Sequence, residues 1–103
     1  MIIEKRTYTL YSGKMPEFLA LYEAEGLELH KKYLPMIGYF VSDIGAQNQI
    51  ITMWGYDSMS DREAKREKLY ADPAWIAFGP KTIHFIQNME NMILRPTSFS
   101  PIR

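Results

Sequence analysis

Along the first third of the chain, the hydrophobic pattern changes from the period of a strand to that of a helix. Residues 2–11 are rich in β-branched and aromatic side chains, which favours a strand that ends at Ser-Gly-Lys 12–14. Residues 16–33 repeat with the period of a helix, whose first turn suits Pro16 and whose end is enforced by Pro35. The predicted apolar face of this helix carries Phe18, Leu19, Tyr22, Gly26, Leu29 and Tyr33.

The pattern then predicts a hairpin, a second helical region and a last strand. Strands are expected at 36–44 and 49–56, joined by a turn. Ser60 and Glu63 have the spacing of a capping box, which predicts a helix from there to about residue 70. The remaining predicted elements are short helical turns at 73–78 and 80–86 interrupted by Gly79-Pro80, a strand at 90–95 and an extended tail at 95–103.

This order, β-α-β-β-α-β, predicts an α+β fold with a ferredoxin-like antiparallel sheet in a single domain, residues 1–103. The helices of such a fold cover one face of the sheet. In the strand at 49–56, Trp54 and Tyr56 point to one face while Ile51 and Met53 point to the other, so both faces carry large apolar groups. We therefore expect two copies to pack sheet against sheet as a homodimeric α/β barrel, alone or within a larger assembly.

Composition and charge remove several classes of function. Lys+Arg and Asp+Glu each total 12, and there is no basic tract, so neither nucleic acid nor an acidic membrane surface is an expected partner. The chain has no cysteine, which excludes disulfides, thiol nucleophiles and cysteine-ligated metals. The charged opening residues predict no signal peptide, and no apolar run is long enough to span a bilayer. A cytoplasmic location is the resulting expectation.

The two histidines are candidate proton-transfer groups. His84 lies among apolar residues, which favours either a partly buried packing role or a general base or axial haem ligand. His30 lies beside Lys31 and Lys32 at the edge of the helical stripe and is predicted to be solvated. No His-x-x-x-His spacing occurs, and we expect no metal site and no bound cofactor.

Two arginines are candidate anion-binding residues. Arg6 shares a strand face with Glu4 and Tyr8, so it either binds a carboxylate or enolate or forms an internal ion pair with Glu4 or Glu90. Arg62 is expected either to enter a cleft or to remain solvated. Arg66 is predicted to belong to a solvated, ion-paired helix surface.

Aromatic residues form either plain core or the wall of a pocket for a flat, apolar ligand. Gly26 lies on the apolar helix face, where alanine would be more stable by about 1 kcal/mol, so a bulky side chain packs on it or a ligand needs the space. The aromatic residues concerned are Tyr39, Trp54, Tyr56, Trp75 and Phe78.

Several stretches together resemble the NIPSNAP family. The opening carries Arg-Thr-Tyr-Thr-Leu at 6–10 and Pro-Glu-Phe at 16–18, and the central hairpin carries Ile-Gly-Tyr-Phe at 37–40. The most specific stretch is Trp-Gly-Tyr-Asp-Ser at 54–58 followed by Asp-Arg-Glu at 61–63. Asp-Pro-Ala-Trp at 72–75 and Leu-Arg-Pro-Thr-Ser-Phe at 94–99 complete a resemblance that covers nearly the whole chain.

The resemblance implies a dimeric α+β barrel and leaves the activity open. The wider barrel superfamily includes cofactor-free monooxygenases, isomerases and haem-degrading enzymes. The haem-degrading members carry a tryptophan some residues before their histidine, which Trp75, nine residues before His84, matches loosely. Arg6 stands where those enzymes carry an asparagine on the first strand. We therefore carry forward three hypotheses. In the first, the chain binds a small apolar or aromatic ligand and acts as a cofactor-independent monooxygenase or isomerase. Arg6 would hold an oxyanion and His84 would move a proton. The ligand-binding residues would be Tyr8, Tyr39, Trp54, Tyr56, Arg62 and Trp75. The second is a non-catalytic scaffold module, and the third is a haem enzyme.

Overall fold

An antiparallel sheet with strand order β2-β3-β1-β4 forms one layer of the computed structural model, which describes residues 1–103. This is the predicted ferredoxin-like topology. The elements are β1 (Ile2–Leu10), α1 (Met15–Leu21), η1 (Tyr22–Gly26), α2 (Leu27–Tyr33), β2 (Met36–Val41), β3 (Gln49–Tyr56), α3 (Met59–Ala71), α4 (Pro73–Thr82), η2 (Ile83–Phe85) and β4 (Ile86–Leu94).

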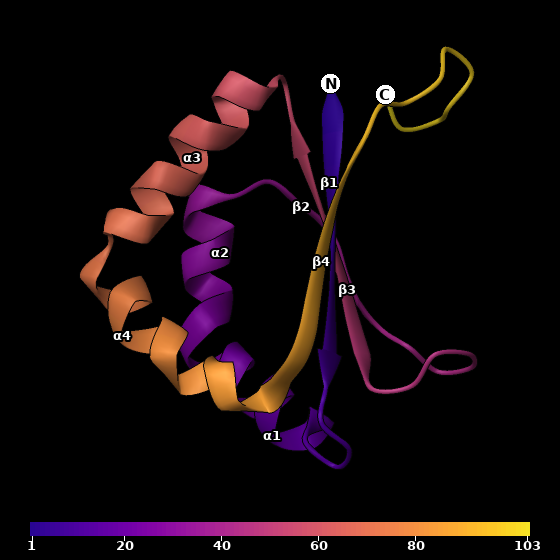
Figure 1. The fold of residues 1–103 in the computed structure, drawn as a ribbon. Coiled ribbons are helices and arrows are strands. Elements are labelled where there is room, and N and C mark those ends of the chain that lie inside the picture. Colours follow the sequence, from indigo (N-terminus) through magenta and orange to yellow (C-terminus); the bar gives the residue numbers. More distant parts are fainter.

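All the helices lie on one side of the sheet, and the other side is bare (Figure 1). β1 is central and pairs with both β3 and β4, so that Arg6 is flanked by Thr52 and Asn91. Because side chains alternate along a strand, Glu4, Arg6 and Tyr8 all face the helices. The strand order thus puts the polar face of β1 in the middle of the space between the two layers.

The first helical region is interrupted by the π-helical segment η1, which the sequence did not predict. The N–H of Leu27 donates to the carbonyl of Tyr22, five residues earlier, instead of four. Such an inserted residue shifts the phase of the inward face by one position. The buried residue of α1 is Phe18, those of η1 are Tyr22 and Gly26, and that of α2 is His30 in place of the expected Leu29.

The start of α3 differs from the predicted capping box. Ser58 is the N-cap, and its side chain accepts a hydrogen bond from the Asp61 N–H, whereas Ser60 lies inside the helix. Ser58 therefore satisfies a backbone donor at the helix start, as Ser60 was expected to do.

Gly79-Pro80 does not interrupt the chain as predicted, because α4 is one helix with Pro80 inside it. Burial of Phe78 against the core overrides the low helix propensity of this pair. The predicted helical turn at 80–86 instead supplies the end of α4, the short η2 and the first residue of β4.

The two outer strands end differently from the prediction. β2 stops at Val41, because residues 43–48 form a series of bends in which Asn48 has a positive φ of 61°. β4 begins at Ile86 instead of residue 90, and the pairing register shifts within its first residues, between Ile86 and Asn88, opposite Thr9 and Leu10. β4 is mostly exposed, so its sequence lacks the alternation that marks a half-buried strand.

The buried residues form two apolar clusters between the sheet and the helices. One contains Leu10, Phe18, Tyr22, Ile50, Phe78 and Phe85, and the other Leu34, Trp54, Tyr56 and Leu69. Trp75 packs against both clusters, so the space between them is bordered by aromatic rings. None of the helices is long and apolar enough to cross a membrane.

Candidate functional site

A cavity of about 460 Å³ lies between the sheet and the helices. This volume is within the usual range for small-molecule sites, and 11 of its 19 lining residues are hydrophobic. The lining contains two arginines, one histidine and no acidic side chain. The lining residues that carry aromatic rings are Tyr8, Phe18, Tyr22, His30, Tyr39, Trp54, Tyr70, Trp75 and Phe78.

The aromatic wall is built by contacts between η1, β2 and α4. Tyr22 stacks on Tyr39 with ring centroids 4.5 Å apart, and Trp75 lies 5.3 Å from Phe78. A Cβ added at Gly26 would approach the Phe78 ring to 2.8 Å. Glycine is therefore needed at position 26 because a bulky side chain packs on it, which is the first of the two explanations predicted for this residue.

His30 lies inside this aromatic wall, so the prediction of a solvated surface histidine is wrong. Only 8% of the residue is exposed, and its ring lies 4.7 Å from both Trp54 and Trp75. Burial, reinforced by the positive charges of Arg66 and Arg6, lowers the pKa of His30 from 6.5 to about 3. His30 is therefore a neutral imidazole at physiological pH.

The two nitrogens of the His30 ring have different surroundings. Nδ1 shares a hydrogen bond of 2.7 Å with the Tyr22 hydroxyl, whose own pKa is raised by burial and by the nearby Tyr8. Nε2 has no hydrogen-bond partner in the chain and is not among the buried unsatisfied atoms, so it is open to the cavity that His30 lines. The Tyr22 bond orients the ring and leaves Nε2 free to contact a ligand.

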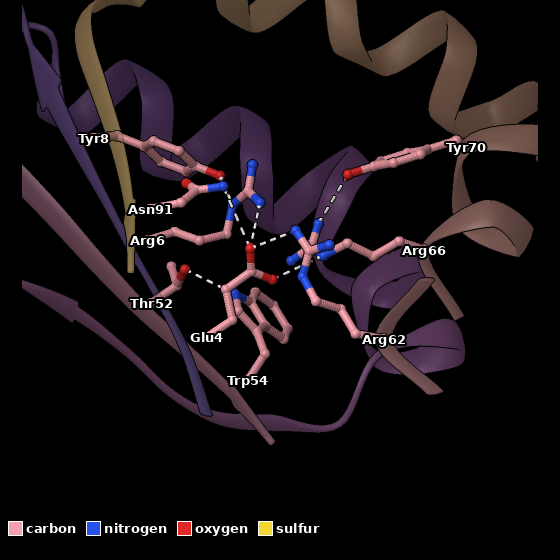
Figure 2. Close-up of polar contacts among 9 residues, drawn as sticks. All are labelled: Glu4, Arg6, Tyr8, Thr52, Trp54, Arg62, Arg66, Tyr70 and Asn91. Carbon is pink, nitrogen blue, oxygen red and sulfur yellow. Dashed lines mark hydrogen bonds and ion pairs between the residues drawn. The ribbon is translucent and has the colours of Figure 1, made fainter. Parts of the chain in front are cut away.

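Beside the cavity lies an ion cluster around Glu4, a side chain that is fully buried (Figure 2). Arg6 Nη1 and Arg62 Nη2 donate to Oε2 of Glu4 at 3.0 and 2.8 Å. Arg66 Nε donates to Oε1 at 3.0 Å. The internal pair of Arg6 with Glu4 confirms one of the two alternatives predicted for Arg6, and Glu90 is not its partner.

Glu4 stays ionised because its partners outweigh its burial. Desolvation alone raises the pKa of the carboxyl, but the hydrogen bond from Arg62 and the charges of Arg66 and Arg6 lower it below the ordinary value of 4.5. Three guanidinium groups share one carboxylate, so the cluster carries a net charge of two positive units.

Helix α3 supplies two of these guanidinium groups from successive turns. Arg66 is 5% exposed, donates to Tyr70 as well as to Glu4, and lines the cavity, so the prediction that it is solvated is wrong. Arg62 points to Glu4 but does not line the cavity. On the outer side of the same helix, Asp61 and Lys65 form an ion pair at 3.0 Å.

The structure brings together five of the eight residues proposed from the sequence. The cavity is lined by Arg6, Tyr8, Tyr39, Trp54 and Trp75. Tyr56 is buried in the second apolar cluster, and Arg62 lies behind Glu4. His84 is exposed beside Phe85 and does not line the cavity, so its predicted partial burial is wrong, and the haem hypothesis lacks the histidine on which it depended.

Sequence reasoning missed His30 and Tyr22 as a pair, and Arg66 as a buried residue. One signal was available for the arginine: Arg62 and Arg66 are four residues apart, which places both on one helix face. The histidine left no such signal, because the π-segment that turns it inward is not visible in the periodicity.

The site chemistry does not identify a reaction, but comparison with known proteins identifies the family. Human protein NipSnap homolog 3A is 34% identical over 71 residues, which are 69% of this chain and 29% of the human protein. This chain thus spans less than a third of that relative. The fold also resembles a putative antibiotic biosynthesis monooxygenase from Nitrosomonas europaea with a TM-score of 0.68, over 93% of this chain and 98% of that one, but at 9% identity the likeness shows the fold alone.

Closer structural likeness is found among bacterial proteins. The crystal structure of a NIPSNAP family protein from Agrobacterium tumefaciens has a TM-score of 0.96 and 48% identity, and the alignment covers 99% of this chain and 98% of that one. The NIPSNAP family model matches residues 3–101. Since this match spans almost the whole sequence, the chain belongs to the NIPSNAP family.

Proposed function

We propose that this domain binds a small, flat and largely apolar molecule in the cavity between its sheet and its helices. The observation that carries the proposal is the cavity itself, about 460 Å³ in volume and walled by aromatic rings. Such walls favour flat ligands through stacking and apolar burial. Trp54 is held in place by a hydrogen bond of 2.9 Å from its Nε1 to Thr52, so this part of the wall exists before a ligand arrives.

Tryptophan fluorescence tests this proposal directly, because the only two tryptophans, Trp54 and Trp75, both line the cavity. Titration with a panel of small aromatic carboxamides and acids is expected to give a saturable change in emission. Gly79 offers a blocking variant, since it lines the cavity and a Cβ added there meets nothing within 4 Å. Gly79→Phe should abolish binding, whereas Gly79→Ala, the matched control, should retain most of it. Absence of a saturable change with the whole panel would contradict the proposal and favour the scaffold hypothesis.

A second candidate function is proton transfer to or from the bound molecule, as in a cofactor-independent isomerase or oxygenase. The neutral His30, with Nδ1 bonded to Tyr22 and Nε2 open to the cavity, favours this candidate. In this proposal His30 takes the role that the sequence assigned to His84. Phenylpyruvate is a suitable probe, because it combines an aromatic ring with an exchangeable C–H next to a ketone.

The measurement for this candidate is the exchange of solvent deuterium into phenylpyruvate, followed by NMR. Wild-type protein should accelerate the exchange above the buffer rate, and His30→Gln should remove the acceleration. His84→Gln, which changes an exposed histidine outside the cavity, should retain it. Equal exchange in all three samples would leave a binding function without catalysis.

The bare face of the sheet supports a further part of the proposal, that the domain pairs with a second copy. Phe40 on β2 is 51% exposed and pairs with Ile51, while Met92 on β4 is 55% exposed and pairs with Lys5. These residues lie on the face opposite to Glu4 and Arg6, where the helices do not reach (Figure 1). Native mass spectrometry should give a dimer or a multiple of it, and Phe40→Asp should shift it toward monomer. A wild-type monomer would contradict this part.

A further inference from the structure

The charge balance of the cavity is incomplete without an anion. Two arginines and no acidic side chain line it, and the three guanidinium groups around Glu4 have one carboxylate among them. A buried excess of charge is costly unless it is paired. Only 5% of Arg66 is exposed, so its charge cannot reach solvent unless the side chain leaves Glu4.

Arg6 offers an accessible free donor to the cavity, whereas Arg66 Nη2 and Arg62 Nε also lack partners but are buried. Its Nε donates to the Tyr8 hydroxyl at 2.7 Å and its Nη1 donates to Glu4. Its Nη2 has no hydrogen-bond partner and is not among the buried unsatisfied atoms, so it is accessible. Since Arg6 lines the cavity, this nitrogen is available to a molecule inside it.

Tyr8 provides a second donor beside Arg6. Its hydroxyl oxygen accepts from Arg6 Nε, which leaves the hydroxyl proton free to donate elsewhere. Tyr8 also lines the cavity, and Figure 2 shows its hydroxyl directed toward Arg6. Glu4 and Tyr8 together fix the guanidinium plane, so Arg6 is held ready before a ligand enters.

We propose that the ligand of this cavity is the anion of an aromatic carboxylic acid, with its carboxylate on Arg6 Nη2 and the Tyr8 hydroxyl. Its apolar body lies against the aromatic wall formed by Tyr39, Trp75 and Phe78. The proposal rests on the proposed function and adds the chemical class of the ligand. Arg66, which also lines the cavity, and Arg62, which lies behind Glu4, contribute positive charge. The cluster therefore attracts the anion while the hydrogen bonds place it.

A pair of probes that differ only in charge tests the inference. Cinnamate and cinnamamide have nearly the same shape, and only the first is an anion at neutral pH. By isothermal titration calorimetry, cinnamate should bind at least about tenfold more tightly, as expected for charge-assisted hydrogen bonds. Equal affinity of the two probes overturns the anion proposal and leaves the cavity as a binding site. Failure of both to bind, together with the fluorescence panel, contradicts the proposed function as well.

Two variants separate direct contact from the general positive field. Arg6→Gln and Arg62→Gln each remove one guanidinium from the same oxygen of Glu4, but only Arg6 lines the cavity. Arg6→Gln should weaken cinnamate binding at least about tenfold and leave cinnamamide unchanged, while Arg62→Gln should weaken cinnamate less than about threefold. Equal losses in both variants would overturn the assignment of the carboxylate to Arg6.

A third variant guards against loss of folding. Arg6→Lys keeps the charge and the ion pair with Glu4, but a lysine lacks the planar fork that bonds Tyr8, Glu4 and a ligand together. It should retain a preference for cinnamate over cinnamamide that is smaller than that of the wild type. A preference equal to that of Arg6→Gln would overturn the role of charge at this position. Circular dichroism on each variant verifies the fold, and the wild-type comparison does not depend on any variant.

Discussion

Two neighbouring parts of the site, a charged one around Glu4 and a neutral one around His30, bury titratable groups in opposite ways. Glu4 is fully buried and stays charged, because three guanidinium groups surround it. His30 is almost as deeply buried and stays neutral, because burial among aromatic rings and the positive charges of Arg66 and Arg6 both oppose its protonation. The comparison shows that burial alone does not decide the charge state of a group. The sign of the surrounding charges decides it, since the same arginines favour the charged form of Glu4 and oppose the charged form of His30.

The largest effect on stability is expected from removing the charge of Glu4. Glu4→Gln keeps the shape of the side chain but leaves three guanidinium groups without a counter-ion. Breaking a buried ion pair in this way costs about 3–5 kcal/mol of unfolding free energy. Urea denaturation measures the loss, and Glu90→Gln, an exposed change on the neighbouring strand, should alter stability by less than about 0.5 kcal/mol. A loss below about 1 kcal/mol in Glu4→Gln would mean that the cluster relaxes into solvent.

The next largest effect is a pH dependence of stability caused by His30. The pKa of His30 is about 3 in the folded protein and 6.5 when unfolded, so the unfolded state binds the extra proton as the pH falls through this window. The stability from neutral His30 is complete above pH 6.5 and decreases toward pH 3. Between pH 6.5 and about pH 5 the loss is about 2 kcal/mol, before Glu4, whose pKa is below 4.5, contributes its own loss at lower pH.

Two variants assign this slope to one histidine. Denaturation midpoints measured across the window should lose most of their pH dependence in His30→Gln. His84→Gln should keep the wild-type slope, because His84 is exposed. An unchanged slope in His30→Gln would show that the imidazole becomes charged inside the folded protein.

A smaller effect is expected from the hydrogen bond that orients His30. Tyr22→Phe removes the hydroxyl and leaves Nδ1 buried without a partner, which costs about 1–2 kcal/mol. Tyr11→Phe is the matched control, because Tyr11 is 50% exposed and its hydroxyl makes no hydrogen bond within the chain. Thermal denaturation compares the two, and equal midpoints would argue that water replaces the Tyr22 hydroxyl.

The smallest effect is expected at the outer edge of the charged cluster. The side chain of Arg62 is 21% exposed and Glu4 keeps two other partners, so Arg62→Gln should cost about 1 kcal/mol or less. Because this pair is partly exposed, added salt should reduce the difference from wild type. Arg66→Gln, at a side chain 6% exposed, should cost more and respond less to salt. The same salt response in both variants would contradict the distinction between edge and interior.

The ion cluster around Glu4 was more predictable from the sequence than the surroundings of His30. Alternation along β1 placed Glu4, Arg6 and Tyr8 on one face, and the ion pair of Arg6 with Glu4 was one of two predicted alternatives. Arg66, another partner of Glu4, lies 62 residues later in the sequence. Only the packing of α3 on the sheet brings it to Glu4. A pattern within one element contains no information about that contact.

The inward position of His30 was not predicted, and the reason lies in the local helix geometry. A regular helix places Tyr22, Leu29 and Tyr33 on one face, but the residue inserted in η1 moves the inward position from Leu29 to His30. The order of the elements was robust to this change, because it depends on which segments are helical or extended and not on exact phase. The position of one catalytic candidate depended on that phase.

The π-segment also determines how this helix tolerates changes in length. Tyr22 and His30 are eight residues apart, and removing one residue between them would leave seven, which is two turns of a regular helix. A deletion at Ala24 would therefore convert the segment to ordinary α-helix while keeping both side chains on the inner face. It would also bring them closer along the helix axis by one residue's rise, about 1.5 Å. This helical region could therefore lose one residue while the same side chains, Tyr22 and His30, still face the sheet.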